Sequence, residues 1–333
     1  MNPATGGEPD SGRLGGLLSG VLLTQIANSA VHLAQPLLVA DLSGSLGSAA
    51  FFSAFGTALH MVGTYLGGWP TERFGARRVL VTTTLLRGVV LAGIPAAMAM
   101  GGLANLTWVM VCYSAEALIR GYVDTSVHTI PLELAGHRPQ LLDRINSRYE
   151  LAFEIGAVVG PLMLSGLMMW SAEIVSHIVI PVGFALSAAC YLLIPERPAI
   201  PVEDRNHTHG GGAWAGVKYI LKHRYLLMVV VGLMLFHLYE LRKDLSAFFA
   251  KGLLHQPHMA GHVGSAFALG GVAGALLYTV TVRRGSGRGW MFAGVGGTVL
   301  LAVAAAGEPV DHGGAVFLFG GVTNVCARLV LTR

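Results

Sequence analysis

Charged residues are scarce in this sequence. Asp, Glu, Lys and Arg make up 12% of the 333 residues, whereas 53% are hydrophobic. Soluble proteins are roughly 25% charged, so this chain has too little polar surface to form ordinary soluble domains. The same composition excludes collagen-like, disordered and nucleic-acid-binding proteins. With a mean hydropathy of +0.60, the sequence predicts a polytopic membrane protein.

Cysteine is also rare, and we expect no disulfide framework. The three cysteines, Cys112, Cys190 and Cys326, each lie inside an apolar run. We therefore expect reduced thiols that pack as small hydrophobic side chains.

The sequence motifs of common enzymes are missing. The chain has no Walker phosphate loop, no His-Glu-x-x-His and no Gly-x-Ser-x-Gly, which are the patterns of nucleotide hydrolysis, metalloproteases and serine hydrolases. We therefore expect no enzymatic activity, no cofactor and no ATP drive within this chain. Of the 13 histidines, only His255, His258 and His262 cluster, at an outer loop, so metal transport is not favoured and no metal site is predicted.

Apolar stretches of the length that a bilayer requires recur along the whole chain. A spanning helix needs about 20 mostly apolar residues, and we identify ten such stretches. The predicted spans are residues 14–40, 49–69, 79–100, 106–130, 149–170, 174–194, 225–246, 261–282, 289–306 and 314–331. The predicted fold class is all-α, a polytopic transmembrane helical bundle of about ten spans in two halves.

A polar interval divides the chain after the sixth span. It begins Pro-Glu-Arg-Pro and contains His-Thr-His-Gly-Gly-Gly, a composition typical of linkers. We expect residues 1–195 to form an N-terminal six-helix half and 196–224 to form a cytoplasmic linker that includes a helix on the membrane surface. Residues 225–333 are then a partial C-terminal half of four helices.

Lys and Arg concentrate in alternate connections between the spans. Cytoplasmic loops retain these residues, so the pattern predicts a cytoplasmic N-terminus. The basic residues on that side are Arg73, Arg77, Arg78, Arg138, Arg144, Arg148, Arg197, Arg205, Lys218, Lys222, Arg224, Arg283, Arg284 and Arg288. The exception follows the seventh span, where Arg242, Lys243 and Lys251 lie near the outer end.

The connection between the second and third spans has a more specific pattern. It reads Gly-Trp-Pro-Thr-Glu-Arg-Phe-Gly-Ala-Arg-Arg. Glycine permits a tight turn and a close approach of helices, and an acid at a helix end interacts with the helix dipole. The positions that define the pattern are Gly68, Glu72, Arg73, Gly75, Arg77 and Arg78.

This pattern resembles the first cytoplasmic loop signature of the major facilitator superfamily, with Glu72 where Asp is commoner. A second motif, Gly156, Gly160 and Pro161 in the fifth span, resembles the Gly-x-x-x-Gly-Pro signature of drug and metabolite exporters in that superfamily. Its small residues let the helix approach a neighbour closely, and the proline bends it.

The resemblance implies a cytoplasmic gate at the first motif and twelve helices in two halves built from inverted repeats. Because we count ten spans, we expect the chain to lack the last two helices. A truncated product is the favoured explanation, and a natural ten-helix transporter is the alternative.

Ionisable side chains within the predicted spans mark the expected pathway. Such groups cost about 2.5–3.5 kcal/mol at the centre of a membrane helix, so they usually face a cavity or a partner. In the fourth span Glu116, Arg120, Asp124 and His128 recur every four residues on one helix face. We interpret this face as a substrate or proton site; the alternative is a salt-bridged contact between the fourth and fifth helices.

Other spans supply further polar residues to this pathway. They are Gln25, Asn28 and His32 of the first span, His60 of the second, Glu150 and Glu154 of the fifth, and His237 and Glu240 of the seventh. The two acids of the fifth span lie where they can meet Arg87, Arg120 or Asp124. The resemblance favours a gating cluster at this depth, and direct substrate contact is the alternative. Histidine changes charge between pH 5 and 8, so the candidate proton sites are Glu116, Asp124, Glu240, His60 and His237.

Taken with the resemblance, these features predict a secondary transporter that works by alternating access. We expect proton-coupled export of a small organic compound, with substrate, protons and the lipid bilayer as partners and no nucleic acid. The expected location is a bacterial-type plasma membrane, and a monomer is the expected state. The alternatives are a solute importer of the same fold and a transport-inactive, truncated membrane protein.

Overall fold

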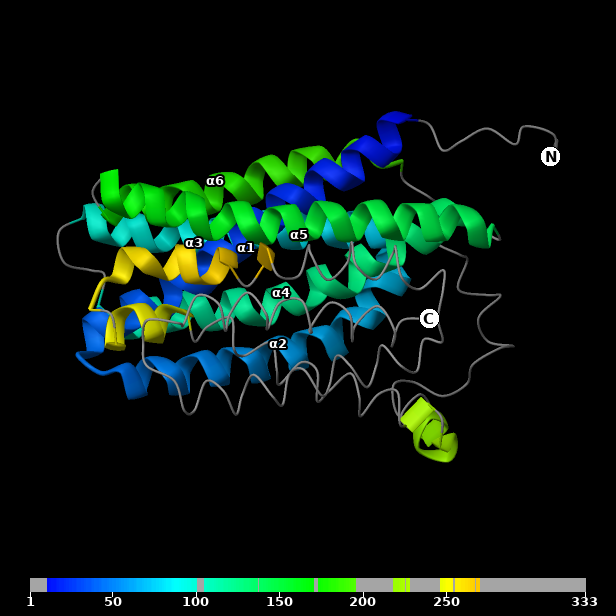
Figure 1. Ribbon diagram of the computed structural model, residues 1–333. Helices are drawn as coiled ribbons and strands as arrows, with labels where there is room; N and C mark the ends of the chain where they lie inside the picture. The colour runs from blue at the N-terminus through cyan, green and yellow to red at the C-terminus, as the bar shows by residue number, and fades with distance from the viewer. Residues whose placement is uncertain are drawn as a thin grey trace, which may run out of the picture.

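Six long helices account for most of the described chain. A computed structural model of the protein describes residues 11–100, 105–136, 138–170, 173–195, 218–224, 226–227, 246–253, 255–266 and 268–269. The helices are α1 (Ser11–Ser43), α2 (Leu46–Phe74), α3 (Ala76–Ala99), α4 (Leu106–Ala135), α5 (Pro139–Trp170) and α6 (Glu173–Tyr191). The short π-helix η2 (Phe249–Leu253) and 3-10 helix η3 (Pro257–Met259) follow later. Figure 1 shows the six long helices side by side, and the described residues contain no strand.

The predicted all-α class and the first six predicted helices are confirmed, with one large difference in bounds. α5 begins at Pro139 rather than at residue 149, because proline is favoured in the first turn of a helix and Ile145 and Tyr149 are buried on one face. Arg144 and Arg148, predicted to lie in a loop, therefore lie on the first turns of α5. The last four predicted spans lie outside the described residues, except for residues 226–227, 246, 261–266 and 268–269.

The junctions between helices are short, and their sequences explain where the helices begin. The Ser45 side chain accepts a hydrogen bond from the Ser48 N–H at 3.3 Å and caps α2, and the Asn105 side chain caps α4 in the same way. Such caps satisfy N–H groups that lack a partner within the helix. Between α2 and α3 the only residue is Gly75, with a φ of +87° that favours glycine.

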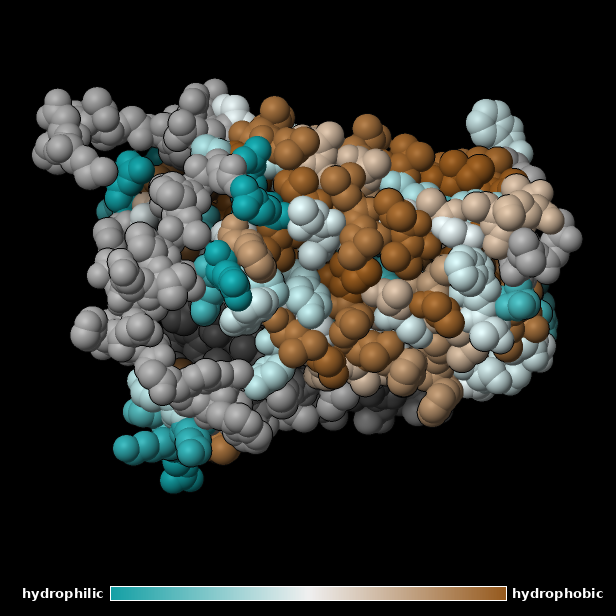
Figure 2. Space-filling view, turned by 180° about the vertical axis from the view of Figure 1, so that it is seen from behind, coloured by the Kyte–Doolittle hydropathy of each residue, from teal (hydrophilic) through white to brown (hydrophobic). Residues whose placement is uncertain are grey.

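Five of the six helices, all except α4, contain stretches long and apolar enough to cross a membrane. α4 has 30 residues, but Glu116, Arg120 and Asp124 lower its mean hydropathy. Large apolar side chains such as Phe51 and Val89 are exposed on the outside of the bundle. Figure 2 shows hydrophobic surface along the length of the body and hydrophilic side chains toward one end, a distribution that fits a body surrounded by lipid.

Two buried apolar clusters lie at the two ends of the bundle. We call the end where α1 begins the N end; in Figure 1 it lies at the right, together with the α2–α3 junction. The N-end cluster includes Leu17, Leu80 and Ile145, and the far-end cluster includes Phe52 and Phe184. α1 packs on α5 and α6, α2 packs on α4, and α3 packs on α4 and α6.

The α2 and α4 backbones touch each other. A Cβ atom on Gly63 would lie 1.9 Å from the Leu118 carbonyl oxygen, and a Cβ atom on Gly121 would lie 2.1 Å from the Thr64 nitrogen. The Thr125 hydroxyl donates to the Thr64 carbonyl at 3.0 Å beside this contact. Close approach of this kind at small residues is a common way for membrane helices to associate.

We expect Gly121→Ala to destabilise the protein by about 1–3 kcal/mol, because the added methyl group requires the two backbones to separate. The matched control is Gly15→Ala on α1, where a Cβ atom would meet nothing within 4 Å. In the control, alanine should be neutral or stabilising by up to ~1 kcal/mol. The midpoint of thermal unfolding of the purified protein in detergent measures both effects, and an equal midpoint for the two variants would contradict the close contact.

Candidate functional site

A layer of polar side chains lies between the two apolar clusters. His60 is the central residue of α2, and Arg87 and Arg120 lie next to the centres of α3 and α4. The layer is therefore at mid-height in the bundle, where a membrane offers no water to charged groups. Its members contact one another as three pairs.

The first pair is Arg87 with Glu116, and both side chains are fully buried at 0% and 1% exposure. Arg87 Nε donates to Glu116 Oε1 at 3.0 Å, and Arg87 Nη2 donates to the same oxygen and to Asn28 Oδ1. The guanidinium also lies 4.2 Å from the centre of the Phe184 ring. The pair joins α3 to α4, and Asn28 ties α1 to it.

The second pair is His32 of α1 with Arg120 of α4, joined by a 2.6 Å contact between His32 Nε2 and Arg120 Nη1. A guanidinium has donors and no acceptor. His32 Nε2 must therefore accept this hydrogen bond, and the ring must carry its proton on Nδ1.

The third pair is His60 of α2 with Asp124 of α4, joined by a 2.7 Å contact between His60 Nε2 and Asp124 Oδ2. An ionised carboxylate only accepts hydrogen bonds, so His60 Nε2 is the donor. This pair is more accessible than the pair of Arg87 and Glu116, with 17% and 35% of the side chains exposed. It lies beside the backbone contact at Gly121.

The three pairs are close enough to act on one another electrostatically. Arg87 interacts electrostatically with Arg120 and Asp124 in addition to Glu116. Glu116 in turn interacts electrostatically with Arg120 and His32. The layer is thus one charge network contributed by α1, α2, α3 and α4.

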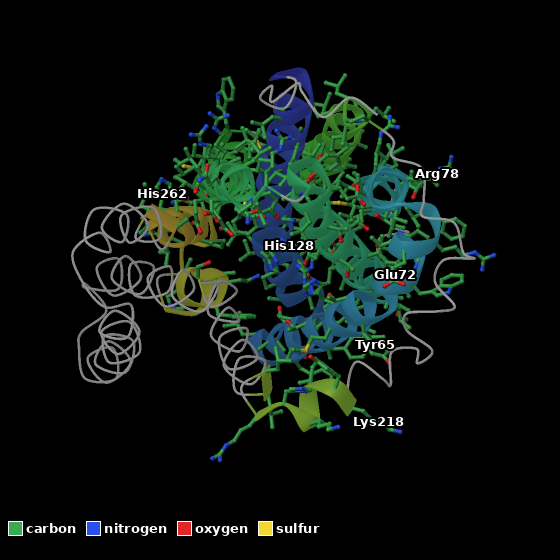
Figure 3. The ribbon with its side chains drawn as sticks, turned by 90° about the vertical axis from the view of Figure 1, so that its right-hand side faces the viewer. Tyr65, Glu72, Arg78, His128, Lys218 and His262 are labelled. Carbon is green, nitrogen blue, oxygen red and sulfur yellow. The ribbon has the colours of Figure 1, made fainter. Side chains whose placement is uncertain are left out.

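The predicted polar face of α4 is present, but its hydrogen bonds differ from the expected ones. The four-residue spacing would let Arg120 pair with an acid one turn above and one turn below on its own helix. In the structure Glu116, Arg120 and Asp124 each hydrogen-bond to a different neighbouring helix. His128, the last member of that face, packs against Tyr149 of α5 with ring centres 5.5 Å apart, and Figure 3 shows it near the middle of the bundle.

The remaining predicted pathway residues are distributed over other places. Glu150 and Glu154 are partly buried on α5, and their predicted meeting with the layer stays a prediction. Gln25 is buried on α1, where its Nε2 donates to Ser29 Oγ at 3.3 Å. His237 and Glu240 lie outside the described residues.

The predicted close approach of the fifth helix is confirmed by the contact between α5 and α1. A Cβ atom on Gly156 would lie 2.9 Å from the Leu22 carbonyl oxygen, and one on Gly160 would lie 2.5 Å from that of Ile26. Pro161 lies inside α5, one residue beyond this contact.

The motif at the α2–α3 junction is mostly helical rather than a loop, because the two helices meet at Gly75. The expected close approach at Gly68 is wrong. A Cβ atom there would meet nothing within 4 Å, whereas one on the preceding Gly67 would lie 3.0 Å from Tyr122 Cα. Gly67 faces α4, and Gly68 is turned away by the helical period.

The arginines of this motif make specific contacts. The Arg73 guanidinium lies 5.0 Å from the centre of the Trp69 ring. Arg77 Nη2 donates to the Leu192 carbonyl at the end of α6 at 2.7 Å. Figure 3 shows Glu72 and Arg78 at the edge of the bundle.

Sequence reasoning named Arg87 only as a partner for the acids of the fifth span, not for Glu116, and it predicted no polar contact between α1 and α6. The Thr24 hydroxyl lies 3.0 Å from Tyr191 Oη, and the Ser187 hydroxyl donates to the Gly20 carbonyl at 2.8 Å. A lone arginine in an apolar span is a signal in itself, because it requires a partner. Ser, Thr and Tyr are too common in membrane helices to give such a signal.

Residues after the polar interval contact α1, α2 and α5. At the far end Lys251 Nζ forms an ion pair with Asp41 and donates to the Leu37 carbonyl at 3.3 Å. Nearer mid-height, Ser265 Oγ donates to the Val158 carbonyl of α5 at 2.9 Å. Lys251 lies in the π-helix η2, a geometry that is frequent at functional sites.

The described cysteines and histidines form neither a disulfide nor a cluster of metal ligands. Cys112 and Cys190 are free thiols, as expected, and Cys326 lies outside the described residues. Within the described ranges no three His, Cys, Asp or Glu side chains come together in a way that could hold a metal ion.

Family comparison identifies the class of protein. The model of the Major Facilitator Superfamily matches residues 17–330. The chain therefore belongs to this superfamily of transporters, and it is an integral membrane protein.

Sequence relatives include proteins named multidrug efflux pump Tap. The chain is 26% identical to the one from Mycolicibacterium fortuitum over 296 residues, which cover 86% of this chain and 71% of that protein. It is 27% identical to the one from Mycobacterium tuberculosis over 276 residues, which cover 80% of this chain and 65% of that protein. The chain thus spans only about two thirds of the length of these relatives.

Solved structures of similar shape include that of the nucleoside transporter NupG. The TM-score is 0.63 at 16% sequence identity, covering 97% of this chain and 80% of that one. A variant of the same transporter gives a TM-score of 0.64 at 15% identity, covering 94% and 79%. At this level of identity the likeness concerns the fold alone.

We expect Arg87→Met or Glu116→Leu alone to destabilise the protein by about 3–5 kcal/mol, because each leaves a buried charge without its partner. In the double variant Arg87→Met with Glu116→Leu, the free energy of unfolding should fall by much less than the sum of the two single losses. Denaturant unfolding of the purified protein in detergent measures the cycle. Additive losses would show that the pair does not act as a unit.

Proposed function

We propose that this protein exports small organic compounds across the plasma membrane in exchange for protons. In this proposal residues 1–195 and the residues after 224 act as two halves, which expose a site at mid-height to the two sides in turn. The cytoplasmic side is the N end of the bundle. Protons supply the driving force, and the substrate is a small organic, drug-like molecule.

The polar layer is the observation that carries this proposal. Fully or partly buried His, Asp, Glu and Arg side chains at the centre of apolar helices are costly, and a protein that only anchored itself in the membrane would gain nothing from them. Histidine and carboxylate side chains bind and release protons, so the layer contains the groups that proton exchange requires.

Two observations favour export over import. The sequence relatives are named efflux pumps, and α5 carries the Gly156, Gly160 and Pro161 motif that resembles the exporter signature. The likeness to a nucleoside transporter concerns the fold and does not favour import.

The ion pair between Asp41 and Lys251 supports alternating access. It joins the end of α1 to a residue beyond the linker, at the far end of the bundle. We infer that this contact belongs to a state closed at the far end, and that it must break for that end to open.

Transport is tested in inverted membrane vesicles, whose outer face corresponds to the cytoplasm. Compounds are first chosen by a growth screen of cells with and without the protein. We expect acidification of the vesicle lumen to drive accumulation of such a compound, up to about tenfold per pH unit for a neutral compound exchanged for one proton. Radiolabelled uptake measures the flux.

The controls for this experiment are vesicles without the protein and vesicles with Asp143→Asn, an exposed acid at the start of α5. An importer would instead release the compound when the lumen is acidified. A transport-inactive protein would show no dependence on the gradient for any compound in the panel.

The far-end contact is tested by Asp41→Cys together with Lys251→Cys in a chain whose own three cysteines are replaced. We expect a short bifunctional thiol reagent to link the two positions and to stop transport, and a reducing agent to restore it. Each single cysteine variant is the matched control. Full transport by the linked protein would show that this contact does not open during the cycle.

A further inference from the structure

We propose that the pair of His60 and Asp124 is the proton-binding site of the polar layer, and that the other two pairs hold the layer in place. The assignment rests on the proposed function, because it names the group that exchanges the proton. The proton adds to Nδ1 of His60, while Nε2–H continues to donate to Asp124.

His60 and His32 make hydrogen bonds of opposite direction. This difference decides which of the two histidines binds the proton. His60 donates to a carboxylate, so a positive charge on its ring strengthens the contact with Asp124. His32 accepts from the guanidinium of Arg120, so a proton on His32 Nε2 would remove the acceptor and place two cations 2.6 Å apart. A proton that enters the layer is therefore bound by His60 in preference to His32.

The pair of Arg87 and Glu116 is unsuited to exchange a proton. Both side chains are wholly buried, and Glu116 already neutralises Arg87. A proton on Glu116 would leave Arg87 as an uncompensated buried cation, which costs several kcal/mol. Asn28 and the Phe184 ring fix the guanidinium further, as expected for a structural pair.

The surroundings of His60 suit a site that switches between two charges. The charged and titratable groups that interact with Asp124, the partner of His60, are Arg120 and His128 on α4 and Arg87 on α3, and His32 on α1 contacts Arg120. With neutral His60, the pair with Asp124 carries one negative charge, and with protonated His60 it carries none. Both side chains are partly exposed, whereas those of Arg87 and Glu116 are wholly buried.

The change of charge on His60 takes place at the backbone contact between α2 and α4. A Cβ atom on Gly121 would lie 2.5 Å from the carbonyl oxygen of His60 itself, so the histidine backbone lies at the α2–α4 backbone contact. Protonation therefore changes the charge of the layer without a need to separate these helices. The charge that a substrate meets in the layer differs by one unit between the two forms.

The first test uses His60→Gln and Asp124→Asn in the vesicle assay. Glutamine still donates a hydrogen bond to Asp124 but binds no proton. We expect both variants to lose the roughly tenfold accumulation driven by a pH unit, while exchange of labelled for unlabelled substrate without a gradient continues. The matched controls are His223→Gln, outside the helix bundle, and Asp143→Asn, and both should keep the accumulation. Full gradient-driven accumulation by His60→Gln would overturn the assignment.

The second test needs no transport, so it separates this assignment from the proposed function. Nitrogen-15 NMR of the purified protein, with labelled histidine, distinguishes the ring tautomers and the protonated form. We expect His32 in the Nδ1–H form, and a His60 ring that becomes doubly protonated when the sample is acidified, with a signal that moves in Asp124→Asn. A His60 ring that stays neutral when the exposed His223 is protonated would overturn the proton site. If wild-type vesicles show no gradient-driven flux but His60 becomes protonated, the site stands and the exchange function fails.

Discussion

The constraint on which this structure depends is that a charge inside a membrane requires a partner. Arg87 is fully buried at the centre of α3, and no residue of its own helix neutralises it. Glu116 on α4 neutralises it, and Asn28 on α1 accepts one of its hydrogen bonds, which fixes the relative heights of three helices. The two apolar clusters above and below the layer fill the remaining space, but hydrophobic contacts alone do not select one register of sliding helices.

Much of the architecture could be predicted from the sequence because membrane helices have a strong signal. The first six helices follow from apolar length alone, and the junction at Gly75 follows from a motif with a glycine at its turn. The ends were less predictable. The start of α5 is amphipathic and basic, so hydropathy places it in a loop, whereas the burial of Ile145 and Tyr149 extends the helix to Pro139.

The candidate site was predictable as a set of residues but not as a set of pairs. Four-residue spacing places Glu116, Arg120 and Asp124 on one face of α4, and that face does point into the bundle. Their partners on α1, α2 and α3 depend on how helices far apart in sequence are rotated, and a single helix pattern does not contain this information. For the same reason the motif predicted a close approach of helices at Gly68, whereas the rotation of α2 directs Gly67 toward α4.

The backbone contact between α2 and α4 limits how the bundle can move. No side chains separate the helices at Gly63 and Gly121. The helices therefore cannot slide past each other by side-chain rearrangement, and water has no room to enter between them. α2 and α4 must then travel as one rigid body, which carries His60 and Asp124 together. In the proposed transport cycle, a passage for the proton would therefore form along the other borders of this two-helix body.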